Sequence, residues 1–194
     1  LVKGFCMFLV VVGHFNPPGA PAWFVIVHDF IYTLHMPVFM AMSGYLYANS
    51  RDTANLAGTL RKKFLRLMVP YFSLSLLITT VKLVASRFVA LDSKVEVASY
   101  LRILYLPEAA AFLWFAYTLF LIFVVMSMTR AIPHRLAILV PIAVVLFFIP
   151  VEFPKALLLN EFKRMFVFFL AGMVLRNAET RIPLKSLWIP ALLL

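Results

Sequence analysis

The chain has 194 residues, of which 64% are hydrophobic and 13% are charged, and its formal net charge is +10. Water-soluble domains carry about 25% charged residues, so this composition excludes an ordinary soluble globular domain. The apolar runs are continuous, whereas the strands of a transmembrane β-barrel alternate apolar and polar residues. The sequence therefore predicts an all-α, polytopic bundle of transmembrane helices.

Apolar stretches long enough to span a bilayer, about 20 residues, recur along the chain. We expect six complete or nearly complete spans, at about 1–15, 23–48, 65–85, 112–128, 136–149 and 162–175, and the start of a seventh near residue 186. A turn at 16–19 ends the first span, and Pro37 interrupts the second. A polar stretch at 86–108 separates the third span from the fourth.

Neither a soluble domain nor an internal repeat interrupts this pattern, so we assign residues 1–194 to one transmembrane domain. The chain begins with Leu1 rather than Met, and it stops within an apolar run. We therefore expect the domain to be incomplete at both ends.

The basic residues are better explained by topology and membrane lipid than by nucleic acid. Lys and Arg in short loops mark the cytoplasmic side of a membrane protein and contact anionic headgroups. They gather after the second, fourth and sixth spans, and the connection at 15–22 has none. We therefore expect the N-terminus in the cytoplasm. Basic residues at 82–102 and 155–164 argue against this orientation, because it places them on the opposite side of the membrane.

Two ionisable residues share the first predicted span. Lys3 and His14 would lie about 16 Å apart along one helix, on nearly the same face. Imidazole exchanges a proton near neutral pH, so His14 is a candidate general base. The alternatives are a structural histidine at a helix end and a snorkelling lysine that sets topology.

A second histidine, His35, precedes Pro37 by two residues. Proline leaves a backbone carbonyl without its helical donor, which a bilayer tolerates where protein or a wet cavity compensates. His35 is therefore a candidate for lining a substrate cavity, and the alternative is a packed histidine beside an ordinary proline kink. His28 and Asp29 are either an orienting pair for this site or solvated residues at the outer surface.

The third candidate is the basic pair Lys63 and Arg66, which lie three residues apart and share a helix face. Arg binds phosphate oxygens bidentately and Lys supplies a point charge, so the pair suits a phosphorylated carrier. The alternative is a cluster that fixes topology and contacts lipid headgroups. Cys6 is the only cysteine and no metal-ligand cluster occurs, so we expect no metal.

At these residues the sequence resembles acyltransferase family 3, which contains fucose 4-O-acetylase-like enzymes. The similar pieces occur in the same order as in the family, and together they cover nearly the whole chain. They are Lys3-Gly4 with Gly13-His14, Leu34-His35-Met36-Pro37, Ser43-Gly44-Tyr45-Leu46, Lys63-x-x-Arg66 with Pro70-Tyr71, Leu113-Trp114-Phe115, and Phe168-Phe169-Leu170-Ala171-Gly172.

The resemblance implies about ten spans and acyl transfer from cytoplasmic acyl-coenzyme A, usually acetyl-CoA, to a hydroxyl of a sugar or cell-surface glycan. It matches Lys3 and His14 to the family's basic residue and histidine in the first span, and Lys63 and Arg66 to its donor-associated basic pair. An acidic residue and an Arg that often precede the first of these motifs are absent from this sequence. The expected location is a bacterial inner membrane.

Chemistry and resemblance together make His14 and His35 the catalytic candidates, with His14 as base and His35 lining the same cavity. Lys63 and Arg66 would bind coenzyme A phosphates, and Lys3 would face the thioester or the pantetheine arm. Two other functions fit the same residues: a proton-coupled secondary transporter, with Pro37 marking a broken helix, and a non-catalytic subunit of glycan export. The acceptor, the acyl chain length and the oligomeric state do not follow from the sequence.

Overall fold

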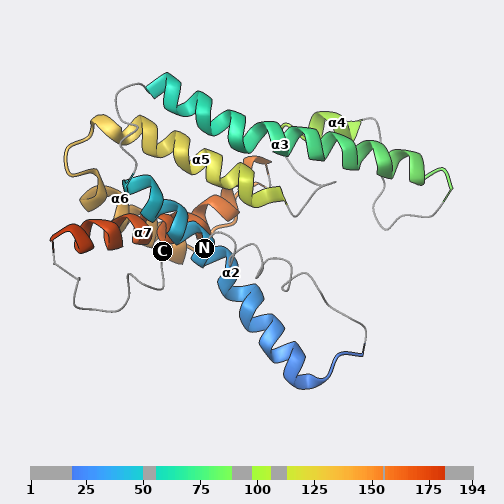
Figure 1. The fold of residues 1–194 in the computed structure, drawn as a ribbon, viewed down its shortest axis with the longest axis horizontal. Coiled ribbons are helices and arrows are strands. Elements are labelled where there is room, and N and C mark those ends of the chain that lie inside the picture. The colour runs from blue at the N-terminus through green and yellow to red at the C-terminus, as the bar shows by residue number, and fades with distance from the viewer. Residues whose placement is uncertain (1–18, 50–55, 89–97, 106–112, 155, 182–194) are drawn as a thin grey trace. The chain divides into compact units, whose positions relative to one another are not determined.

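The computed structural model describes residues 19–49, 56–88, 98–105, 113–154 and 156–181. In these residues the regular structure is entirely helical (Figure 1). The elements are α2 (Ala22–Asn49), α3 (Leu56–Ala85), α4 (Ala98–Arg102), α5 (Trp114–Met128), the 3₁₀ turn η2 (Thr129–Ala131), α6 (Arg135–Phe148), the 3₁₀ turn η3 (Ala156–Leu158) and α7 (Leu159–Arg181). The all-α prediction is confirmed for this part of the chain.

In the part of the chain that the structure describes, three helices are long and apolar enough to cross a membrane: Ala22–Asn49, Ala57–Ala85 and Trp114–Ala131. They correspond to the second, third and fourth predicted spans. The fifth prediction coincides with α6, a shorter apolar helix, and the sixth lies inside α7, whose two ends are charged. The first and seventh predicted spans lie outside the described residues.

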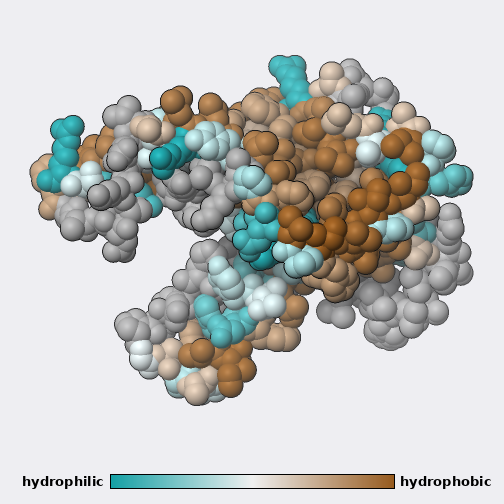
Figure 2. Space-filling view, turned by 180° about the vertical axis from the view of Figure 1, so that it is seen from behind, coloured by the Kyte–Doolittle hydropathy of each residue, from teal (hydrophilic) through white to brown (hydrophobic). Residues whose placement is uncertain are grey.

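Large apolar side chains remain exposed on the described helices, and brown patches are visible on the face shown in Figure 2. Phe30 and Leu34 of α2 are 66% and 41% exposed, and Leu77 of α3 is 58% exposed. In water such surfaces would be an aggregation hazard, whereas lipid tails or further helices can cover them. The exposed apolar surface therefore agrees with helices that lie in a membrane.

The chain divides into two compact units, residues 1–50 with 136–142 and 165–194, and residues 51–135 with 143–164. In the second unit, α3 and α5 lie side by side and run in opposite directions (Figure 1). The rings of Tyr71 and Tyr117 are 5.5 Å apart in the core between them. Their hydroxyls donate to the neighbouring carbonyls of Ile103 and Leu104, at 2.7 and 3.2 Å. These bonds fasten the segment after α4 to the helix pair.

In the first unit, two glycines let α2 and α7 cross at very short range. A Cβ atom on Gly44 would collide with the backbone carbonyl of Phe169, and one on Gly172 would collide with that of Ala41. Small residues at such a crossing allow the close van der Waals contact that holds helices together in lipid. The Ser43-Gly44-Tyr45 and Ala171-Gly172 motifs of the sequence therefore meet at one crossing.

A polar cluster continues this crossing toward the C-terminal ends of α2 and α7. The Tyr45 hydroxyl donates to Glu179 at 2.5 Å, and the Arg176 guanidinium donates to Glu179 at 3.0 Å and to Asn49 at 2.8 Å. The guanidinium also lies 5.5 Å from the centroid of the Tyr45 ring. The bond from Tyr45 and the nearby Arg176 charge hold the pKa of the Glu179 carboxyl below its ordinary value. The cluster therefore keeps its ion pair at neutral pH.

The glycine crossing predicts how the protein responds to added volume. Gly172→Val should lower the melting temperature of the detergent-purified protein by several degrees, because the new side chain meets backbone and overpacking costs about 1–3 kcal/mol. Ala171→Val is the matched control, since Ala171 is the adjacent residue and is exposed. Equal melting temperatures for the two variants would contradict the close crossing.

Candidate functional site

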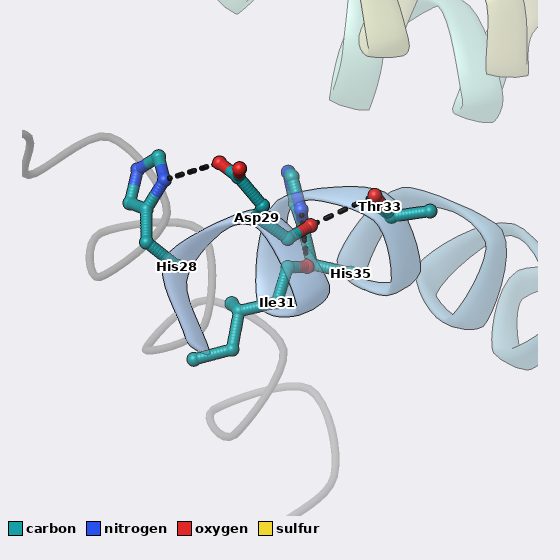
Figure 3. A network of polar contacts seen from close by, with 5 residues as sticks. All are labelled: His28, Asp29, Ile31, Thr33 and His35. Atoms are coloured by element: carbon teal, nitrogen blue, oxygen red, sulfur yellow. Dashed lines mark hydrogen bonds and ion pairs between the residues drawn. The ribbon is translucent and has the colours of Figure 1, made fainter. Parts of the chain in front are cut away.

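His35 is buried on α2, with only 2% of its surface exposed. Its Nδ1 lies 3.0 Å from the carbonyl oxygen of Ile31, one turn earlier (Figure 3). A carbonyl oxygen only accepts hydrogen bonds, so Nδ1 carries the proton. In the neutral imidazole the lone pair is then on Nε2, which is the atom able to take a proton. The structure thus fixes both the orientation and the tautomer of His35.

Pro37 lies inside the same helix and does not end it. Having no N–H, it withdraws the donor that the carbonyl of Thr33 would receive in an uninterrupted helix. The preceding turn carries side-chain bonds to the backbone: the Thr33 hydroxyl donates to the Asp29 carbonyl at 2.8 Å, and His35 donates to Ile31 (Figure 3). His35 is therefore held within the turn that the proline weakens.

His28 and Asp29 contact each other, and Asp29 is also exposed, so a feature of each of the two sequence interpretations is present. The His28 Nδ1 and an Asp29 carboxylate oxygen are 3.2 Å apart (Figure 3). The side chain of Asp29 is 72% exposed and that of His28 is 12% exposed. The Asp29 carboxylate therefore contacts the His28 ring. It does not bind the Nδ1 of His35, which donates to the Ile31 carbonyl.

Aromatic rings and imidazoles follow one another along this face of α2. The ring centroids of Phe24 and His28 are 6.1 Å apart, those of His28 and Tyr32 are 6.0 Å apart, and those of Tyr32 and His35 are 5.3 Å apart. The series follows from spacings of four, four and three residues, which return to the same helix face. It connects His28, whose neighbour Asp29 is exposed, to the buried His35.

Lys63 and Arg66 both lie on α3, within the second unit. The Lys63 ammonium lies 4.5 Å from the centroid of the Phe123 ring on α5, a cation–π contact, and Lys63 is half-buried. Arg66 is exposed. The pair therefore combines a lysine whose position is fixed by a neighbouring helix with an arginine at the surface.

The sequence interpretation missed a buried cation, Lys163, which is only 6% exposed. Its ammonium donates to the carbonyls of Ile149 and Val151 at 2.9 and 2.8 Å and lies 5.9 Å from the centroid of the Phe153 ring. Carbonyls at the end of α6 lack helical donors, and the helix dipole favours a cation there. Proline at 150 was the available signal, because it ends the helix and leaves its last carbonyls free.

The remaining candidates, Lys3 and His14, lie outside the described residues. His35 belongs to the first unit, and Lys63 and Arg66 belong to the second. In the described part of the chain, no group of three His, Cys, Asp or Glu side chains is arranged to hold a metal ion.

The comparisons with known proteins agree with the pattern of motifs. The family model described as an acyltransferase domain matches residues 1–194. No curated protein and no solved structure matches the chain. With its apolar helices, this is a membrane acyltransferase: the chain belongs to acyltransferase family 3.

Proposed function

We propose that the protein transfers an acyl group, in the first instance acetyl, from acyl-coenzyme A to a hydroxyl of a sugar or cell-surface glycan. The family supports acyl transfer. The single structural observation that supports the site is His35, a buried imidazole whose Nδ1 is bonded to Ile31. That bond leaves a proton-accepting nitrogen within an apolar helix.

In the proposed reaction a base takes the proton of the acceptor hydroxyl as its oxygen attacks the thioester carbonyl. The carbon–sulfur bond then breaks, and coenzyme A leaves as a thiolate that is protonated. We assign the base to His14, and His35 lines the same cavity. Lys3 lies beside the thioester or pantetheine arm, and Lys63 and Arg66 bind the coenzyme A phosphates. No resident metal takes part.

The length of α2 indicates which part of this helix crosses the hydrocarbon core and how deep His35 lies in it. From Asp29 to Asn49 the helix rises about 30 Å, the thickness of the hydrocarbon core. Asn49 belongs to the Arg176 cluster, and Asp29 is exposed, so polar side chains mark both ends of this length. His35 then lies about 9 Å from the Asp29 end.

We assign the C-terminal end of α2 to the cytoplasmic face, because basic residues follow it and such residues favour the cytoplasmic side, and we take the membrane to be a bacterial inner membrane. The Asp29 end then faces outward. Acyl-coenzyme A, made in the cytoplasm, enters from the side of Lys63 and Arg66. The acceptor approaches His35 from the outside, so neither substrate needs to cross the membrane completely. We assign residues 1–194 to one transmembrane domain.

The first test is transfer of labelled acetyl groups from acetyl-CoA by the purified full-length protein. His14→Ala should lower the rate by about 100-fold or more, the usual effect of removing a general base. Expression and elution in gel filtration should match those of the unmodified protein. More than half of the original activity would contradict the assignment of His14. Complete absence of transfer by the unmodified protein would favour a transporter or an export subunit.

His35 can be tested with a matched pair of variants. His35→Asn keeps a side-chain N–H that can reach the Ile31 carbonyl but removes Nε2, whereas His35→Ala removes both. If Nε2 faces the reaction, both variants should lose about tenfold or more in acyl transfer, and only the alanine variant should also lose thermal stability. Restored activity in His35→Asn would show that the imidazole is structural only.

Lys63 and Arg66 are tested by their effect on the donor. The double variant Lys63→Gln/Arg66→Gln should raise the KM for acetyl-CoA and leave the KM for the acceptor nearly constant, because charge-assisted bonds to phosphate are lost. Arg61→Gln/Lys62→Gln is the control, since it removes the same charge from an exposed neighbouring pair. An unchanged donor KM together with inverted topology would show that the pair serves orientation only.

A further inference from the structure

The N-terminal half of α2 carries a group of side chains that the proposed reaction does not use. It consists of the His28–Asp29 pair and the rings of Phe24 and Tyr32, which are in series with His35. We propose that this face binds the sugar ring of the acceptor, with Asp29, His28 and Tyr32 as the contacts that set its position. The inference rests on the proposed function, because it assigns the acceptor side of the same site.

The exposure of Asp29 is the first argument. Its side chain is 72% exposed, and an ionised carboxylate in contact with lipid tails costs several kcal/mol. Asp29 must therefore face water or a polar ligand. A carboxylate has about four acceptor positions, and the bond to His28 uses one of them. The others can accept hydroxyl protons, which a sugar presents in adjacent pairs.

The rings supply the second argument. The planes of Phe24 and His28 differ by 25°, and those of His28 and Tyr32 differ by 19°, so the rings are nearly parallel. Tyr32 is 55% exposed. Ring surfaces with a few well-placed polar groups are typical of small-molecule sites, and the C–H faces of a pyranose pack on aromatic rings. Lipid tails would use the rings but not the carboxylate.

Position along the helix supplies the third argument. His28 and His35 are seven residues apart, which places them about 10 Å from each other on the same face of α2. That separation accommodates one or two sugar rings. A ring held by Asp29 and Tyr32 could thus present a hydroxyl toward the buried imidazole, while the rest of the acceptor stays at the outer surface.

The experiment measures acetyl transfer by the full-length protein from labelled acetyl-CoA to the methyl glycosides of glucose, galactose and fucose. Asp29→Asn should raise the KM for the best of these acceptors by about tenfold or more, because bonds to a charged group are lost. Asp29→Glu should restore part of this loss. Tyr32→Ala should raise the acceptor KM, and Tyr32→Phe should not. The KM for acetyl-CoA should stay within about twofold throughout.

Two controls match these changes. Glu152→Gln removes an exposed carboxylate outside α2, and Phe30→Ala removes an exposed ring that points away from the series, about 200° around the helix from His28. Both should leave the acceptor KM unchanged. Because Asp29 is exposed and Asn keeps its shape, Asp29→Asn tests the charge without removing packed volume.

The outcomes separate this site from the proposed function. If transfer is intact but Asp29→Asn and Tyr32→Ala leave the acceptor KM within about twofold, the sugar site is wrong, the rings belong to an interfacial belt, and the acyltransferase function stands. If the unmodified protein acetylates none of the glycosides and does not hydrolyse acetyl-CoA, the proposed function is wrong and the sugar site falls with it.

Discussion

The cost of placing a polar group in hydrocarbon governs most of what is distinctive in this structure. A charged side chain at the centre of a bilayer costs about 2.5–3.5 kcal/mol even on insertion scales. The buried Lys163 donates to the carbonyls of Ile149 and Val151, which follow α6, and Arg176 binds Glu179 and Asn49 at one end of the proposed span. His35 follows the same rule through Ile31. In each case the hydrogen bond that stabilises the polar side chain also fixes the orientation of that side chain.

α2 shows how the same constraint can arrange a reaction along one helix. Its C-terminal half is held by the glycine crossing with α7 and by the Tyr45–Glu179 bond. Its N-terminal half carries the ring series and the exposed Asp29. His35 and Pro37 lie between the two halves. The C-terminal half of α2 is therefore fixed by packing against α7, and its N-terminal half leaves polar side chains exposed.

The sequence predicted the helical class and three of the spans, because hydropathy over about 20 residues is a strong signal. The predicted third span begins at 65, whereas α3 begins at Leu56, because the basic stretch at 61–63 lowers hydropathy while favouring helix. A five-residue helix, α4, was also missed inside the polar stretch at 86–108. Hydropathy reports the lipid boundary, and helices extend beyond it.

The contacts of the site could not be derived in this way, because they join residues far apart in the chain or depend on one side-chain rotamer. Nothing in the pattern around Gly44 and Gly172 says that these two residues meet, since small residues occur at many positions that make no crossing. The tautomer of His35 likewise depends on a bond to Ile31 that composition does not contain. The structure does explain two of the sequence motifs by the contacts between α2 and α7. Ser43-Gly44-Tyr45 supplies a crossing point and a hydroxyl for Glu179, and Ala171-Gly172 supplies the opposing surface. Part of the motif pattern therefore reflects helix packing.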